Sequence, residues 1–288
     1  MELFIDFSSY LRRGTLSIQG ASLFTQHVKN YFKLYGREFA WRETWEPYHI
    51  VVSEVMLQQT QTERVKYKYQ LFIEAFPTFQ SLAEASLADV YYYWQGLGYN
   101  RRALALQKIA QKVVAEFGGV LPNGPEILET FPGIGKATAA SICAFAFNKP
   151  TVFIETNIRT VFIHSFYRAS KKNIHDDQIR YLVANTLDSE NPRLWYYALM
   201  DYGVAIKKEL GNQNHRSAHY TKQSKFEGSE RQVRGLILKA LQKSGWLTSV
   251  RLSELINRDL EKVERNLKNL QRDGLIVKKD ELFGFAGR

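Results

Sequence analysis

Apolar residues recur at helical spacing through most of the first 205 positions, whereas the alternating pattern of strands is scarce. Proline, threonine and asparagine residues stand where helices usually begin. On these signals we predict helices at 48–61 after Pro47, 79–85 after Pro77, 126–130 after Pro125 and 158–166 after a cap at Thr156 or Asn157. Short connections join them, as in a compact helical bundle. The chain is therefore predicted to be all-α.

The C-terminal part shows a different pattern. Residues 207–228 lose the apolar periodicity and become polar and basic, so we predict a long ordered loop or linker there. Beyond it, we predict helices at 231–243, at 252–257 and along Leu260, Val263, Leu267 and Leu270, followed by short strands at 275–277 and 282–283. Three helices and a β-hairpin are typical of a winged helix-turn-helix, which binds DNA or, alternatively, only protein. We predict such a module at 229–288.

Composition narrows the class of protein. With 288 residues, 45% hydrophobic and 24% charged, the chain is near the length at which one core splits in two. Its 39 Lys and Arg residues against 29 Asp and Glu residues leave a net charge of +10, which favours nucleic acid or an anionic membrane surface as partner. No apolar stretch approaches about 18 residues and no secretory signal is recognisable, so we expect a cytoplasmic, nucleoid-associated monomer without a membrane partner.

The single cysteine, Cys143, excludes an internal disulfide framework, a Cys-rich zinc site and a four-thiolate iron–sulfur cluster. His215 and His219 are spaced four residues apart, but the sequence offers them no thiolate and no third ligand. We therefore expect no metal and no cofactor.

A helix-hairpin-helix is predicted at 128–142. One helix stops at Pro132, Gly133 and Gly135 permit a tight turn, and an alanine-rich helix follows at once. The N–H groups of Gly133, Gly135 and Ala137, together with the charge of Lys136, predict a phosphate site that reads no bases. The alternative is a turn between helices with a structural role alone.

Glu54 lies in the predicted helix 48–61, whose residues before Gln58 are apolar nearly all round. Burial there would desolvate the carboxyl and raise its pKa, as a general acid requires. The alternative is a core glutamate paired with a buried Arg or Lys.

Glu155 follows the apolar run 151–154 and precedes the helix at 158–166, where unpaired N–H groups favour the ionised form. The alternative is a carboxylate that only caps the helix. One carboxyl kept protonated and another kept ionised could protonate a leaving group while stabilising an oxocarbenium-like sugar cation. Cleavage of an N-glycosidic bond requires both functions.

Four motifs in order identify a resemblance. The motifs are Ser-Glu-Val-Met-Leu-Gln-Gln-Thr-Gln at 53–61, Trp-Gln-Gly-Leu-Gly-Tyr at 94–99 followed by Arg101-Arg102-Ala103, Phe-Pro-Gly-Ile-Gly-Lys-Ala-Thr-Ala at 131–139 and Asn157-Ile158-Arg159. Together they resemble the helix-hairpin-helix DNA glycosylase superfamily. Within it, adenine glycosylases of the MutY type are the best match, over roughly 25–205. The resemblance implies a two-lobed fold with a DNA cleft and a flipped base. The lobes would be 41–150, with six helices and the hairpin, and 1–40 with 151–228.

The resemblance also implies residue roles. Glu54 matches the general acid that protonates the base and activates water, and Glu155 stands where the family usually has Asp to stabilise the cation. Gln59 and Tyr99 match positions that fill or wedge the duplex as the base leaves. Further residues expected at the double-stranded DNA partner are Gln58, Arg101, Gly133, Gly135, Lys136 and Ala137.

Departures from the family pattern modify these expectations. Ala137 replaces the Schiff-base lysine of bifunctional relatives, so β-lyase chemistry is not expected. Residues 207–228 replace the iron–sulfur loop, and Glu155, longer than Asp, is followed by Thr156 where Gly is usual. We expect a monofunctional DNA glycosylase acting on adenine in a mismatch or opposite a lesion. The alternatives are a glycosylase for uracil or thymine mismatches or for a modified pyrimidine, including one in foreign DNA, and a catalytically silent DNA-binding protein.

Overall fold

The computed structural model describes residues 4–170, 173–223 and 225–285. These residues form two compact units. The first comprises the described residues of Met1–Pro47, Asn123–Glu126 and Gly135–Lys222, and the second those of Tyr48–Pro122, Ile127–Ile134 and Gln223–Arg288. The division differs from the lobes expected from the sequence in two ways. Helix α9 (Lys136–Phe147) groups with the first unit, where Phe145 stacks on Tyr197 at 4.6 Å, and the C-terminal residues group with the second.

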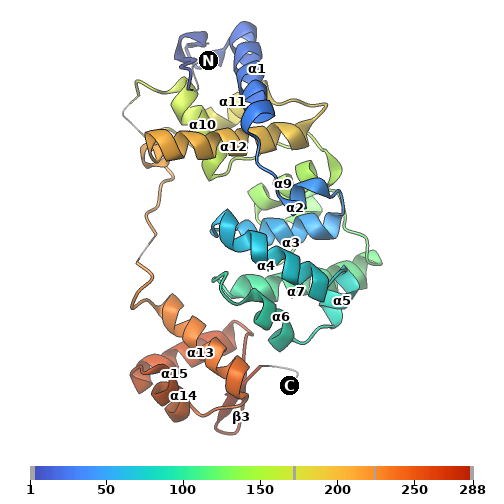
Figure 1. Cartoon of the computed structure of the whole chain (residues 1–288), viewed down its shortest axis with the longest axis vertical. Helices are drawn as coiled ribbons and strands as arrows, with labels where there is room; N and C mark the ends of the chain where they lie inside the picture. Colours follow the sequence, from blue (N-terminus) through green and yellow to red (C-terminus); the bar gives the residue numbers. More distant parts are fainter. Residues whose placement is uncertain (1–3, 171–172, 224, 286–288) are drawn as a thin grey trace. The chain divides into compact units, whose positions relative to one another are not determined.

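Four long helices build most of the first unit: α1 (Ile18–Tyr35), α10 (Thr156–Phe166), α11 (Asp176–Thr186) and α12 (Pro192–Leu210) (Figure 1). A 3₁₀ turn at Ser8–Tyr10, the short strands β1 (Leu11–Arg12) and β2 (Thr15–Leu16) and helix α2 (Ala40–Glu43) complete its N-terminal part. Its core is aromatic, because Phe24 packs on Phe162, Phe166 and Trp195 with ring centroids 5.0–6.0 Å apart. Such rings bury a large apolar area at little cost in side-chain entropy.

The loop predicted at 207–228 starts later than expected, because α12 continues to Leu210, and it is anchored soon after that helix ends. A 3₁₀ turn at Gln213–Arg216 places Asn214 in the interior, where its Nδ2 donates to Thr156 O at 3.2 Å and to Thr160 Oγ1 at 2.7 Å. Arg216 donates to Ser170 O at 2.7 Å. Asn214 thus ties this part of the segment to α10 and Arg216 ties it to a residue after α10, so it is held in place without apolar periodicity.

The second unit begins with five helices, two of which start with a side-chain cap. They are α3 (Pro47–Leu57), α4 (Thr62–Ala75), α5 (Phe79–Glu84), α6 (Leu87–Trp94) and α7 (Arg101–Phe117), and the residues of the short α8 (Pro125–Leu128) are divided between the two units. Thr78 and Ser86 accept hydrogen bonds from the first turns of α5 and α6. The helices predicted at 48–61 and 126–130 are both shorter in the structure, and the first ends at Leu57.

Three helices and an antiparallel hairpin close the chain: α13 (Glu230–Ser244), α14 (Ser249–Ile256), α15 (Leu260–Arg272), β3 (Val277–Lys279) and β4 (Leu282–Gly284). Val277 pairs with Gly284, and Leu247 forms a bridge to Phe283. The first strand begins later than predicted, because Leu275 N still donates to Leu270 O at the end of α15. Leu275 and Ile276 are buried in the core. That core is continuous with α6, since Leu87, Ala88 and Tyr91 share one hydrophobic cluster with the buried residues of α13–α15.

Most described residues outside loops are helical, as predicted, and the strands are short. Within the described ranges, no helix combines the length and apolar character needed to cross a membrane.

Gly203 of α12 permits a close approach that an alanine would prevent. A Cβ there would lie 2.8 Å from the carbonyl carbon of Asn157. We expect Gly203→Ala to lower the free energy of unfolding by about 1–3 kcal/mol, because the backbone in the first turn of α10 cannot yield cheaply. Urea denaturation followed by circular dichroism measures the change.

Gly235 of α13 is the matched control, because no described heavy atom lies within 4 Å of the position of its Cβ. Gly235→Ala should stabilise by about 0.5–1 kcal/mol through the better helix propensity of alanine. Equal effects of the two substitutions would contradict the packing argument.

Candidate active site

Glu54 lies on α3, a helix buried nearly all round. Ile50, Val51, Val52 and Val55 are each at most 2% exposed, whereas Glu54 is intermediate in exposure. The burial of the helix is therefore confirmed, but full desolvation of Glu54 is not. Glu54 therefore lies at the border between the core and solvent.

Arg102 caps the end of that helix from another part of the chain. Its Nη1 donates to the carbonyl oxygens of Val55 at 2.8 Å, Met56 at 2.8 Å and Gln58 at 2.6 Å. The last carbonyls of a helix have no intrahelical donors, so a guanidinium satisfies them and stabilises the negative end of the helix dipole. Burial lowers the pKa of Arg102 to about 10, which leaves it charged at neutral pH. This contact ends α3 at Leu57.

The same guanidinium joins two turns. Its Nη2 donates to Thr60 Oγ1 at 2.8 Å, Leu97 O at 3.2 Å and Gly98 O at 3.1 Å, and Thr60 Oγ1 lies 3.2 Å from Leu97 O. Gln59, at φ +54°, and Tyr99, at φ +47°, have left-handed backbones in these turns. Non-glycine residues adopt this conformation at a cost of about 1–3 kcal/mol, so the surrounding hydrogen bonds must hold them. Sequence reasoning included Arg102 in a motif but missed this role.

The hairpin has the predicted geometry. Gly133 has φ +77°, and a Cβ on it would lie 3.1 Å from that of Ala105. Gly135, which has no side chain to act as a cap, precedes α9, so the first N–H groups of this helix lack intrahelical acceptors. Lys136 and Ala137 are exposed there. The turn is thus confirmed, and phosphate binding by it stays a prediction.

Gln58 connects the hairpin to the end of α3. Its Nε2 donates to Gly133 O at 3.2 Å. Gln58, which the resemblance places at the DNA, therefore forms a hydrogen bond within the protein itself. Gln59 beside it is exposed.

Glu155 is itself the N-cap of α10, so the predicted cap at Thr156 or Asn157 is wrong. Its Oε1 accepts hydrogen bonds from the N–H groups of Asn157 at 2.8 Å and Ile158 at 3.0 Å, and Oε2 from Asn157 Nδ2 at 3.3 Å. A glutamate one methylene longer than aspartate reaches back to these donors from the position before the helix.

The electrostatic expectation for Glu155 also needs correction. Burial raises its pKa above the ordinary value of 4.5, although the hydrogen bonds from Asn157 and Ile158 and the charge of Arg159 act in the opposite direction. Some of the residue remains exposed, yet protein atoms surround the carboxyl closely enough for desolvation to dominate. Once ionised, a poorly solvated carboxylate interacts strongly with a nearby cation.

The predicted residues divide between the two units. The second contains Glu54, Gln58, Gln59, Tyr99, Arg101 and Gly133, and the first contains Glu155, Gly135, Lys136 and Ala137. Arg101, expected at the DNA, is 72% exposed at its side chain and pairs with Asp273 at 2.9 Å. The C-terminal helices therefore contact this part of the candidate site, which the sequence did not indicate.

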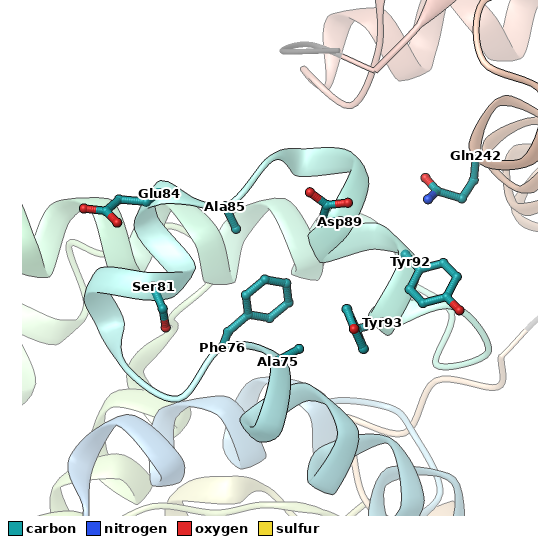
Figure 2. Close-up of a pocket in the computed structure, with 9 residues that line it drawn as sticks. All are labelled: Ala75, Phe76, Ser81, Glu84, Ala85, Asp89, Tyr92, Tyr93 and Gln242. Carbon is teal, nitrogen blue, oxygen red and sulfur yellow. The ribbon is translucent and has the colours of Figure 1, made fainter.

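A groove of about 720 Å³ in the second unit is separate from these residues (Figure 2). Phe76 is among the residues that line it, with Asp89 of α6 above its ring and Tyr93 to the right of it in the view. None of the predicted site residues is among the described residues that line it.

Metal-ligating side chains do not gather in the described part of the chain: no three or more His, Cys, Asp or Glu residues are placed to hold an ion. Cys143 is buried, and burial raises the pKa of its thiol to about 11. His215 instead hydrogen-bonds through Nδ1 to Asn212 O.

Residues 52–185 match the family model described as "HhH-GPD superfamily base excision DNA repair protein". The adenine DNA glycosylase of Mycolicibacterium smegmatis is 30% identical over 269 residues, which cover 87% of this chain and 92% of that protein. The adenine DNA glycosylase of Buchnera aphidicola subsp. Baizongia pistaciae is 34% identical over 189 residues, covering 64% of this chain and 53% of that protein. The human one is 34% identical over 181 residues, with 59% and 33% covered. The chain thus matches about half the length of the Buchnera protein and a third of the human one.

Solved structures share the fold. A thermostable thymine-DNA glycosylase superposes with a TM-score of 0.59 at 23% identity, covering 69% of this chain and 92% of that one. A non-covalent endonuclease III–DNA complex superposes with a TM-score of 0.56 at 16% identity, covering 71% and 96%.

The raised pKa of Glu155 predicts how stability depends on pH. A carboxyl whose pKa is higher in the folded state than in the unfolded chain stabilises the fold while protonated and loses that contribution as pH rises through the folded-state pKa. Glu155→Gln keeps the acceptor for Asn157 and Ile158 but carries no charge. We therefore expect it to be at least as stable as wild type, with an advantage that grows between pH 4 and pH 8 in urea titrations.

Glu155→Ala is the control, because it removes both the charge and the cap and should lose about 1 kcal/mol relative to Glu155→Gln at every pH. A constant difference between Glu155→Gln and wild type across this range would show that the fold does not raise the pKa.

Proposed function

The chain belongs to the HhH-GPD superfamily of base excision DNA repair proteins, among the adenine DNA glycosylases, and from this premise we propose that it is a monofunctional DNA glycosylase. It flips a target base out of double-stranded DNA, hydrolyses the N-glycosidic bond and leaves an abasic site. The observation that supports this most is the position of Glu54 on a buried helix whose end is joined to the hairpin through Gln58 and to the turns of Gln59 and Tyr99 through Arg102.

Glu54 acts as the general acid. Its carboxyl donates a proton to a ring nitrogen of the flipped base, so the electron pair of the breaking C1′–N bond leaves with a neutral base. Intermediate exposure suits this task, because the carboxyl must reach the base and yet lie in surroundings that do not fully solvate its charge. After proton transfer the same carboxylate activates the water that attacks C1′.

Glu155 stabilises the positive charge that develops on the sugar. The N–H groups of Asn157 and Ile158 hold one of its oxygens, which fixes the carboxylate before the reaction starts. Because its pKa is raised by burial, excision should require a pH at which it is ionised. The longer side chain of Glu155 thus takes the role that the family usually assigns to aspartate.

Adenine, in a mismatch or opposite a lesion, is the proposed target, since the relatives that match most of this chain are named adenine DNA glycosylases. Uracil, thymine or a modified pyrimidine would be the target if the base pocket departs from theirs. A catalytically silent DNA-binding protein is the remaining outcome of the experiments below.

The C-terminal helices and hairpin form a winged helix in this proposal, with DNA as its partner. Exposed cations on α15 and the hairpin could neutralise phosphates, namely Lys268, Arg272, Lys278 and Lys279. A repair enzyme of this kind works as a monomer on chromosomal DNA, and its location follows that of the DNA.

The function is tested by incubating the protein with duplexes that each carry one candidate base, followed by alkali to reveal abasic sites. We expect excision of adenine opposite guanine or 8-oxoguanine. Glu54→Gln should lower the single-turnover rate by at least about 100-fold, because an amide cannot transfer the proton. Binding to the duplex should stay within a few-fold.

Glu63→Gln, an exposed acid at the start of α4, controls for the loss of one negative charge and should behave as wild type. Glu155→Gln should also abolish excision, whereas Glu155→Asp should retain it. Substantial activity of Glu54→Gln would assign the acid to another residue, and inactivity of wild type on every duplex would favour the silent DNA-binding protein.

The reaction type provides an independent test. Ala137 offers no amine where bifunctional relatives carry a lysine, so water is the nucleophile and the product strand should remain intact until alkali or heat is applied. We therefore expect no protein–DNA adduct on treatment with borohydride. Efficient trapping that disappears in Lys136→Ala would show that the neighbouring exposed lysine attacks the sugar.

A further inference from the structure

A C-terminal arginine contacts the residue that we expect to wedge the duplex. Arg231, in the first turn of α13, donates from Nη1 to Tyr99 Oη at 3.0 Å, and its guanidinium carbon lies 5.6 Å from the centre of the tyrosine ring. The guanidinium of Arg102 lies 5.4 Å from the same ring. Two arginines, 129 positions apart in the sequence (231 − 102), therefore restrain one side chain.

We propose that Arg231 is a positioning residue, through which the C-terminal helices hold Tyr99 ready to enter the duplex when the target base leaves. The proposal deepens the proposed function and rests on it. It assigns the C-terminal part a role in base flipping itself, in addition to any contact it makes with phosphates.

The turn that carries Tyr99 needs such support. Gly96 and Gly98, at φ +92° and +72°, are exposed, and Tyr99 itself has a left-handed backbone. Arg102 fixes the backbone of this turn through Leu97 O and Gly98 O, whereas the tyrosine hydroxyl is reached from α13. Arg231 supplies that bond, so the orientation of the ring is established before DNA binds. A tyrosine ring that is already oriented does not lose side-chain conformational freedom when the base flips.

Arg231 is held rigidly enough for this role. Ser229 caps α13, and Val233 and Ile237 pack into the cluster that includes Leu87 and Tyr91 of α6. A second contact joins the C-terminal helices to α7: Asp273, 4% exposed at its side chain, pairs with Arg101 of α7 at 2.9 Å and with Arg234 of α13 at 2.5 Å.

The local charge also suits a duplex. Four arginines contact either the tyrosine ring or this aspartate, namely Arg101, Arg102, Arg231 and Arg234. The contact thus combines an aromatic ring, which can stack on bases, with cations, which attract the phosphates on either side of them.

The test compares Arg231→Gln with Lys239→Gln, which removes one exposed positive charge from the same helix. Three quantities are measured: the Kd for a duplex, the single-turnover excision rate at saturating enzyme, and the fluorescence of 2-aminopurine beside the target base, which rises when the base unstacks. Both variants should weaken binding by the same few-fold, since each loses one cation. Only Arg231→Gln should lower the excision rate, by about five- to tenfold, together with the fluorescence gain.

Tyr99→Phe keeps the ring and removes the hydroxyl that accepts the hydrogen bond. Combined with Arg231→Gln, it should cost less than the sum of the two single effects on the excision rate, because both remove the same contact. Unfolding midpoints measured for every variant separate this effect from a loss of folded protein.

Three results would overturn the proposal: equal excision rates for Arg231→Gln and Lys239→Gln, additive effects in the double variant, or a faster rate in Arg231→Gln, which would mean that the arginine restrains the tyrosine. Failure of the wild-type protein to excise any base would contradict the proposed function instead. In that case the 2-aminopurine signal, which requires only distortion of the duplex, still tests Arg231.

Discussion

The guanidinium of Arg102 is the contact on which the candidate site in the second unit depends. It is the donor for carbonyl oxygens at the end of α3 and for two carbonyl oxygens in the turn before α7. The oxygens of Val55 and Met56 lie in the last turn of the helix, where a buried carbonyl left without a donor costs about 1–3 kcal/mol. Leu97 O and Gly98 O also accept from Thr60 Oγ1 and Trp94 Nε1, so there Arg102 adds a second donor. One buried cation thus stops the helix of Glu54, shapes the turn of Gln59 and shapes the turn of Tyr99. A lysine could not replace it, because a single ammonium lacks the planar fork that reaches both turns.

The two carboxylates differ in how the protein prepares them. Glu54 sits on a rigid apolar helix and keeps part of its surface accessible, so its environment is set by the surrounding core. Glu155 is fixed by the N–H groups at the start of α10, while burial opposes its ionisation. The cap orients this carboxylate and the poor solvation strengthens its attraction for a cation, so the two effects serve the same proposed role. Gly203 contributes by letting α12 approach the backbone of Asn157 closely.

The C-terminal helices share a hydrophobic core with α6, so within the second unit they pack against α6 and are held by more than a linker. This packing brings Arg231 to Tyr99 and Asp273 to Arg101. In the first unit, Asn214 and Arg216 attach the polar segment after α12 by hydrogen bonds to α10 and to the residues that follow it. Side-chain-to-backbone bonds thus order a stretch in which the resemblance led us to expect a loop without an iron–sulfur cluster.

The sequence by itself determined the helical class, the glycine turn before α9, the burial of α3 and the three helices and hairpin at the C-terminus, because each depends on side chains that are neighbours in the chain. Only the tertiary structure decided that α3 ends at Leu57, since its capping donor is 45 positions further along (102 − 57). It likewise decided the direction of the pKa shift of Glu155, because desolvation depends on every atom packed around the carboxyl. The contact between Tyr99 and Arg231 joins residues 132 positions apart, and no local pattern of apolar and polar residues specifies such a pair.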